Sequence, residues 1–297
     1  MIHYCYLVLP ILILLSGSHV HAADKVGPVP EALKKEWKLS DYYQKCILSD
    51  GLPILSSDKV SDFALLEAHY VIDSMLKGRD DVRKSIVASR VRLAIMSVNE
   101  FTLDIPEHSD LKPKEYWNRR ARGLGATRVR PAVSCGEENL LDYPGDPYHT
   151  ESIMVHEFAH VVHQQGLAKV DRKFQEKLQA CYDAAKEGGL WKGTYAISNP
   201  AEYWAEAVQS WFHCNRTNDA QHNDINSREQ LKKYDPRVVK LLEEAFPDNN
   251  WLYVKPSKRK ELAHLQGFDK SKAPRFRWPE AMEREYNEYL KNQKKKP

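Results

Sequence analysis

Hydrophobic residues recur at helical spacing in the segment DFALLEAHYVIDSMLKG. Phe63, Leu66 and Tyr70 fall on one face, Asp62 is suited to cap the first turn, and Gly78 is suited to end the helix. This pattern predicts a helix that buries one face against a core. The next segment, DDVRKSIVAS, predicts a second and shorter helix.

Three further helices are expected downstream. The first covers SIMVHEFAHVVHQQG, between a capping Thr150 and a closing Gly166. The second spans about residues 170–186. The third begins at the tripeptide SNP, where Asn199 can cap the helix and Pro200 suits its first position.

Alternation of apolar and polar residues predicts strands in two places. In RVRLAIMSV, the apolar Val91, Leu93 and Ile95 alternate with polar or small residues. The stretch TRVRPAVS also alternates, and Pro131 has no N–H to donate, so the strand within residues 127–135 is expected near an edge of its sheet. Several helices with a few short strands indicate an α+β fold.

The beginning of the chain has a different composition from the rest. The stretch YLVLPILILLSGSHVHAA is an apolar run followed by small residues, which is typical of a secretory signal peptide that ends at Ala22 or Ala23. We expect residues 1–23 to be removed and the remainder to be secreted and extracellular. No segment reaches the roughly 20 apolar residues of a spanning helix, so no membrane span is expected.

The remaining chain is expected to have three parts. Residues 24–84 predict a mostly helical N-terminal segment that packs on the main domain. Residues 85–247 predict the main domain, with both strands and the histidine-rich helix. Residues 248–297 are rich in Pro, Lys and aromatic residues and predict a surface extension with a basic tail.

Charge gives little indication of a partner. The chain has 44 Lys and Arg against 41 Asp and Glu. This near balance gives no reason to expect a nucleic acid as partner. We expect a monomer.

The expected mature chain has an even number of cysteines: Cys46, Cys135, Cys181 and Cys214. In an oxidising compartment this number favours two disulfides. Three pairings are possible, and we favour Cys46 with Cys135 and Cys181 with Cys214, because each pair then stays within one half of the chain. A glycosylation sequon begins at Asn215.

The sequence HEFAH matches the H-E-x-x-H pattern of zinc-binding helices. Four residues advance a helix by about 400° and roughly 6 Å, so His156 and His160 project from one face and can share a cation. Glu157 points aside, toward a metal-bound water. His163 lies roughly 10.5 Å along the axis from His156 and is expected to pack instead of binding the metal. The alternative is a helix whose histidines have a purely structural role.

The third ligand is expected from a second helix, in TYAISNPAEYWAEAVQSWF. Glu202 and Glu206 lie one turn apart there. One carboxylate can bind the zinc and the other can hydrogen-bond a ligating imidazole. We assign Glu202 to the metal and Glu206 to the imidazole. The alternative for Glu202 is a capping box with Asn199.

The pairing of HEFAH with YAISNPAEYWAEA resembles the catalytic domain of the anthrax lethal factor and the related Pro-Pro endopeptidases. In that group a tyrosine precedes the zinc-binding glutamate by seven residues, as Tyr195 precedes Glu202 here. The resemblance covers roughly residues 85–215. It implies a zincin-like fold, in which a small sheet presents an edge strand to a peptide above the active-site helix.

The resemblance also implies roles for single residues. His156, His160 and Glu202 would bind one Zn²⁺ per chain, Glu157 would act as general base, and Tyr195 would stabilise the oxyanion. We therefore expect a secreted metalloendopeptidase whose partner is a peptide or protein substrate, with the extracellular matrix as one source.

Two other functions stay open. The first is a catalytically silent matrix or binding protein that retains the zincin fold, although a structural zinc site needs neither a general base nor an oxyanion donor. The second is a lectin-like or inhibitory module without metal. The sequence identifies neither the substrate nor the bond that is cleaved.

Overall fold

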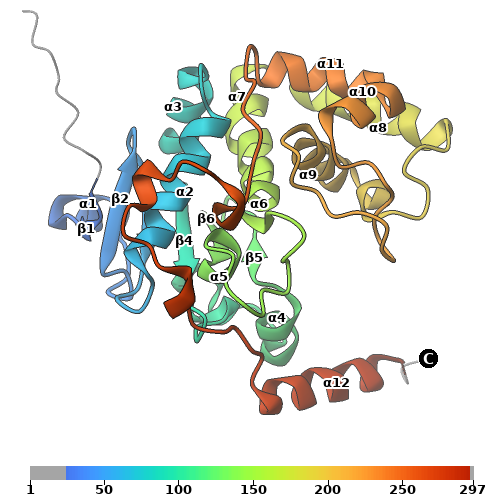
Figure 1. Ribbon diagram of the computed structural model, residues 1–297. Helices are drawn as coiled ribbons and strands as arrows, with labels where there is room; N and C mark the ends of the chain where they lie inside the picture. The colour runs from blue at the N-terminus through green and yellow to red at the C-terminus, as the bar shows by residue number, and fades with distance from the viewer. Residues whose placement is uncertain (1–24, 295–297) are drawn as a thin grey trace, which may run out of the picture.

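The computed structural model describes residues 25–294, so the expected signal peptide lies outside the described residues. The fold is mixed, with helices around a single six-stranded sheet (Figure 1). The α+β class expected from the sequence is therefore confirmed. The strands are β1 (Gly27–Pro28), β2 (Lys45–Ser49), β3 (Leu52–Ser56), β4 (Arg92–Met96), β5 (Gly123–Leu124) and β6 (Ala132–Gly136).

The α-helices of the described chain differ widely in length. They are α1 (Glu31–Trp37), α2 (Asp62–Met75), α3 (Asp80–Ala88), α4 (Lys114–Arg120), α5 (Glu137–Leu140), α6 (Ile153–Val161), α7 (Ala168–Val170), α8 (Phe174–Glu187), α9 (Pro200–Trp211), α10 (Arg228–Tyr234), α11 (Pro236–Ala245) and α12 (Glu280–Lys294). The segments at α2, α3, α8 and α9 are helical as predicted.

The strand order is β1-β2-β3-β4-β6-β5. The strands β3, β4 and β6 are parallel to one another, and β5 adds to β6 in the antiparallel direction. The hairpin between β2 and β3 turns at Asp50 and Gly51, whose φ angles of 45° and 88° suit a two-residue turn. One sheet therefore contains strands from both sides of the domain boundary expected at residue 85.

The edge strand is not the one predicted. The strand expected near the edge is β6, but β6 lies between β4 and β5, and the two-residue β5 forms that edge. Pro131 immediately precedes β6 and so removes no ladder hydrogen bond from the strand.

Apolar residues cover both faces of the sheet. One face carries Ile54, Leu93 and Val133 and packs against the larger cluster, which includes side chains of α2, α6 and α9. The opposite face, with Leu55 and Ala94, packs against a smaller cluster near α1. The sheet is thus covered on both sides, and α6 lies against its larger core.

The histidine-rich helix begins and ends differently from the prediction. Ser152, not Thr150, caps α6, because its side chain accepts from the Val155 N–H at 3.3 Å. Gly166 does not end the helix, which continues as a π-helical segment over Val162–Leu167 and then as α7. A Cβ at Gly166 would meet Val82 Cγ1 at 2.6 Å, so this glycine permits the close packing of α3.

The segment after α11 wraps over the molecule before it forms α12 (Figure 1). His264 hydrogen-bonds the buried carboxylate of Glu67 on α2 at 2.8 Å, and Arg259 bonds the same carboxylate. No residue of α12 is buried, and this helix is fixed to α4 through contacts that include the ion pair between Arg119 and Glu283. The surface extension expected for residues 248–297 therefore carries a well-formed helix.

The predicted disulfides are wrong for this structure, because all four cysteines of the described chain are free. Cys46 lies on β2 and Cys135 on β6, with β3 and β4 between them. The two side chains also belong to the cores on opposite faces of the sheet. Cys181 and Cys214 are likewise unbridged.

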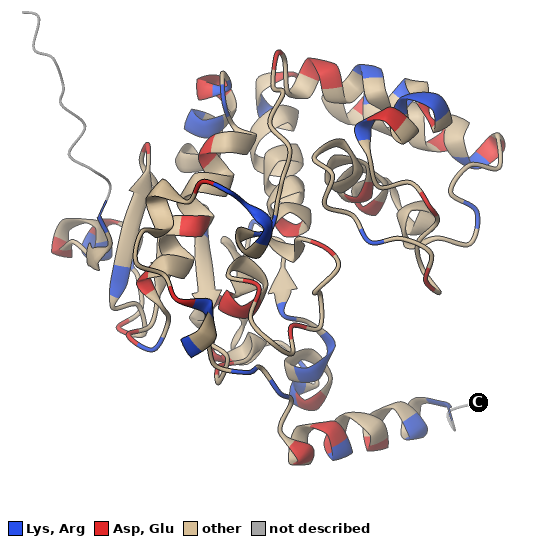
Figure 2. Ribbon diagram, in the orientation of Figure 1, with Lys and Arg blue, Asp and Glu red and all other residues tan. Residues whose placement is uncertain are grey.

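Charged residues of both signs lie over the surface. Basic and acidic positions are interspersed along α10, α11 and α12 (Figure 2). Among the described residues, no helix is both long and apolar enough to cross a lipid bilayer.

Candidate metal centre

Two helices bring the predicted ligands together. The start of α6 is fixed by Asn139, whose side-chain oxygen accepts from the Ile153 N–H at 2.9 Å. The start of α9 is capped by Asn199, which accepts from the N–H groups of Ala201 and Glu202. This capping role does not prevent the Glu202 side chain from reaching the two histidines. The buried Trp204 joins the helices, because its Nε1 donates to the Ala159 carbonyl at 2.9 Å.

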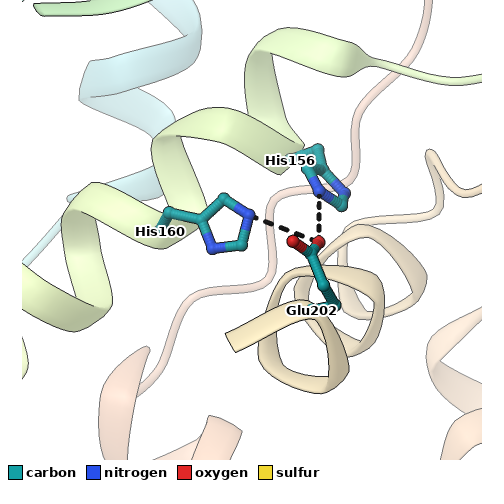
Figure 3. Close-up of side chains that lie close together, drawn as sticks. All are labelled: His156, His160 and Glu202. Carbon is teal, nitrogen blue, oxygen red and sulfur yellow. Dashed lines mark hydrogen bonds and ion pairs between the residues drawn. The ribbon is translucent and has the colours of Figure 1, made fainter. Parts of the chain in front are cut away.

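His156, His160 and Glu202 form a cluster suited to a metal ion (Figure 3). Their ligand atoms all lie within 4.8 Å of one another. Glu202 Oε2 is 3.1 Å from His156 Nε2 and 3.5 Å from His160 Nε2. Tetrahedral zinc bonds of about 2.0–2.1 Å place neighbouring ligand atoms about 3.4 Å apart, which is close to the two distances from Glu202 to the imidazoles. Two imidazoles and a carboxylate are also donors of the type that zinc accepts.

The charges of the cluster also suit a divalent cation. Burial disfavours the charged imidazole of His156, but the hydrogen bond to Glu202 and the charge of Glu157 outweigh burial and raise its pKa to about 10. Burial acts to raise the pKa of Glu202, yet hydrogen bonds from His156 and His160 hold that pKa well below its ordinary value. The carboxylate is therefore ionised, and a metal would take the place of protons on the imidazoles.

Gln209 fixes the orientation of the His156 ring. The Gln209 Nε2 group donates to Glu151 Oε2 at 3.0 Å and to the Ser152 carbonyl at 3.1 Å. Its Oε1 atom therefore faces His156 Nδ1 at 2.9 Å and must accept. The Nδ1 atom then carries the proton, which leaves the Nε2 lone pair for the metal.

Glu206 does not make the close imidazole contact predicted for it. Its Oε1 lies 3.6 Å from His156 Nδ1, farther than the Gln209 oxygen. The other oxygen, Oε2, lies 3.3 Å from His222 Nε2 and accepts from Asn215 Nδ2 at 3.0 Å. Glu206 thus adds negative charge beside His156, while its hydrogen bonds hold the chain that follows α9.

The same contacts involve the glycosylation candidate. Asn215 is 5% exposed, and its Nδ2 group has the Glu206 carbonyl, the Glu206 carboxylate and Ser210 as acceptors. The atom that a glycan would modify is therefore buried and occupied in the folded protein.

Glu157 and Tyr195 line one cavity of about 600 Å³ together with the three metal-ligand candidates. Burial raises the pKa of the Glu157 carboxyl, while the charges of His156 and His160 act in the opposite direction. Burial also raises the pKa of Tyr195, and the negative charge of Glu202 adds to this effect. The phenol therefore keeps its proton and can donate a hydrogen bond.

The edge strand forms one wall of this cavity, which Gly123 and Gly125 also line. A Cβ at Gly123 would approach Glu157 Cγ at 3.1 Å, and one at Gly125 would approach the His160 Cβ at 3.3 Å. These two glycines therefore let the edge backbone lie close to the side chains of α6.

His163 lies outside the cluster, as its helical spacing predicts. It is buried, its Nε2 is 2.7 Å from Gln175 Oε1, and its ring packs near those of Phe174 and Trp204. This histidine fills the interface between α6, α8 and α9.

Sequence reasoning missed Gln209 and Arg120. Gln209 follows Glu202 by seven residues and so lies on the same face of α9, a spacing that marks it as a neighbour of the site. Arg120 lines the cavity from the end of α4. No local pattern marks Arg120, because its approach to the metal ligands depends on how α4 packs.

The chain matches none of the protein-family models with which it was compared, and no curated protein is significantly similar to it in sequence. The interpretation of the site therefore depends on the residues and geometry described above.

Proposed function

We propose that this protein is a zinc-dependent endopeptidase with a zincin-like fold, similar in its active site to the lethal factor and Pro-Pro endopeptidase group. The observation that carries the proposal is the cluster of His156, His160 and Glu202 in one cavity with Glu157 and Tyr195. A metal site with a structural role alone has no need of a neighbouring carboxylate and phenol. Secretion, expected from residues 1–23, is part of the proposal.

The roles follow from the positions of the groups. A bound zinc would supply a Lewis acid and lower the pKa of its water toward 7. Glu157 lies beside the ligands without belonging to the cluster, so it is placed to accept the proton of the attacking water. Tyr195 keeps its proton and would donate to the carbonyl oxygen as negative charge develops there.

The edge of the sheet supports a peptide as substrate. The strand β5 pairs with β6 on one side only, so the segment after Gly123 presents backbone groups toward the cavity. An extended peptide could add to this edge by β-augmentation. The peptide would therefore add to β5 and not to the strand within residues 127–135, which the sequence predicts near an edge.

The alternative is a silent binding protein that has kept the same fold. Retention of Glu157 and Tyr195 in the cavity favours the enzyme. The test is cleavage of a diverse peptide library by purified, zinc-loaded protein, with and without a chelator. Chelator-sensitive cleavage supports the enzyme, whereas zinc binding without any cleavage favours the silent protein.

A further inference from the structure

The cavity contains one arginine that lacks an acidic partner. Arg120 and Arg216 both line it. Arg216 is an ion-pair partner of Glu151 at 3.0 Å. Within residues 25–294, by contrast, no ion pair involves Arg120, whose side chain is exposed.

The neighbouring arginine of α4, Arg119, differs from Arg120 in having an acidic partner. Arg119 is 2.8 Å from the Glu283 carboxylate of α12 and lies over the ring of Trp278 at 4.7 Å. Arg119 thus has a structural role in fixing α12. Arg120 instead lines the cavity, where its electrostatic neighbours are the phenol groups of Tyr148, Tyr116 and Tyr195.

An unpaired guanidinium in such a cavity favours a carboxylate from outside the protein. Arginine donors match carboxylate oxygens in bidentate geometry. Three carboxylates on the cavity wall already have close partners: Glu202 contacts both imidazoles, Glu206 contacts Asn215 and His222, and Glu151 contacts Arg216. Burial raises the pKa of the fourth, Glu157, and Arg120 is near enough for its charge to act in the opposite direction, but the two side chains form no ion pair within the described residues.

The direction of the edge strand indicates which part of a peptide would meet Arg120. Gly125 lies against His160, one of the metal-ligand candidates, and Arg120 precedes Gly125 in the chain. A peptide that adds to β5 in the antiparallel direction runs opposite to it. Residues of the peptide on the C-terminal side of the scissile bond would therefore approach the end of α4.

We propose that Arg120 is a specificity-determining residue that binds a carboxylate of the substrate on the C-terminal side of the cleaved bond. This inference rests on the proposed peptidase function. Two sources share this chemistry: the side chain of an Asp or Glu residue, and the free C-terminus of a short peptide.

The experiment compares matched peptides on the zinc-loaded protein. A peptide that the wild type cleaves is prepared with Asp or Asn at each of the two positions after the scissile bond, and with a free or amidated C-terminus. Arg120→Ala removes the proposed partner. The control, Arg128→Ala, removes an exposed positive charge near the same edge segment but outside the cavity wall.

Arg120 should act on one class of peptide. We expect Arg120→Ala to lower kcat/KM for the carboxylate peptide by roughly 10- to 100-fold and to leave its neutral match nearly unchanged. Arg128→Ala should change kcat/KM by the same factor for the carboxylate peptide and for its neutral match. An advantage of Asp over Asn assigns the carboxylate to a side chain, and an advantage of acid over amide assigns it to the C-terminus. Equal loss for both members of every pair would overturn the proposal.

A binding measurement separates this inference from the proposed function. The same peptides are titrated by calorimetry into zinc-loaded Glu157→Gln protein, with and without Arg120→Ala. If the wild type cleaves nothing, the peptidase proposal fails, and matched Asp and Asn peptides from the uncleaved library replace these peptides. Arg120-dependent binding of the acidic member then still supports carboxylate recognition. If Arg120→Ala weakens acidic and neutral peptides equally, or neither, carboxylate recognition fails even where cleavage is observed.

Discussion

The side-chain oxygen of Gln209 on α9 lies 2.9 Å from Nδ1 of His156 on α6. Because the Gln209 amide nitrogen donates to Glu151 and to the Ser152 carbonyl, the amide cannot turn over without losing both bonds. Gln209 is fully buried, so water cannot replace the hydrogen-bond partners that it would lose. One glutamine thus determines which nitrogen of His156 is available to a metal.

We therefore predict that Gln209→Met binds zinc about 10- to 100-fold more weakly, the range found when a partner of a ligating histidine is lost. Methionine retains much of the buried volume, but its thioether sulfur is only a weak acceptor for a hydrogen bond from Nδ1–H. Competition with a chromophoric chelator measures the affinity. Gln179→Met, on the exposed side of α8, is the matched control and should bind zinc as the wild type does. Equal affinity in the two variants would show that Gln209 does not orient the ring.

The two glutamates of α9 should respond differently to the same change. Glu202→Gln removes the ionised oxygen near both imidazoles and should be isolated with far less than one zinc per chain. Glu206→Gln keeps an oxygen for Asn215 and should retain one zinc at saturating metal. Metal analysis by mass spectrometry after dialysis makes the comparison. Zinc loss from Glu206→Gln but not from Glu202→Gln would show that the ligand is Glu206, one helical turn later.

Tyr195→Phe tests the proposed oxyanion donor. The phenol lines the cavity with Glu157 and Glu202, so the variant should keep zinc and lose roughly 10²- to 10³-fold in kcat with little change in KM. Steady-state kinetics together with metal analysis would detect this pattern. A parallel loss of zinc would instead give Tyr195 a structural role.

Glu137 is expected to make stability depend on pH. It is 3% exposed, and burial raises its pKa from 4.5 to about 7. The folded state favours the protonated form of Glu137. Its contribution to the free energy of unfolding is therefore complete below pH 4.5 and is lost as the pH rises through about 7. Between these values, the metal-free wild type should lose about 3 kcal/mol of unfolding free energy relative to Glu137→Gln. Urea unfolding in excess chelator measures the difference, and a constant difference would contradict the assignment.

Several helices and the candidate metal-ligand cluster could be predicted because local spacing determines them. Periodicity marks α2, and Asn199 followed by Pro200 marks the start of α9. The H-E-x-x-H spacing places His156 and His160 on one face whatever the rest of the fold. Strand β3 was not recognised, because all five of its residues are buried and the alternation of a half-exposed strand is absent. The Asp50-Gly51 turn before it was the available signal.

Features that depend on packing could not be predicted in the same way. Gly166 suggests a helix end, but here it allows α3 to approach the continuing helix. The cysteine count suggests disulfides, but the sheet order places β3 and β4 between Cys46 and Cys135. The edge position of β5 likewise follows from the strand order and not from its two residues.

The proposed function requires this site to hydrolyse peptide bonds with Glu157 as the general base. The most direct measurement is peptide-library cleavage by wild type and Glu157→Gln, each shown beforehand to contain one zinc per chain. We expect chelator-sensitive cleavage by the wild type and none above background by Glu157→Gln, because the amide cannot accept the proton of the attacking water. Cleavage by Glu157→Gln at the wild-type rate would contradict it.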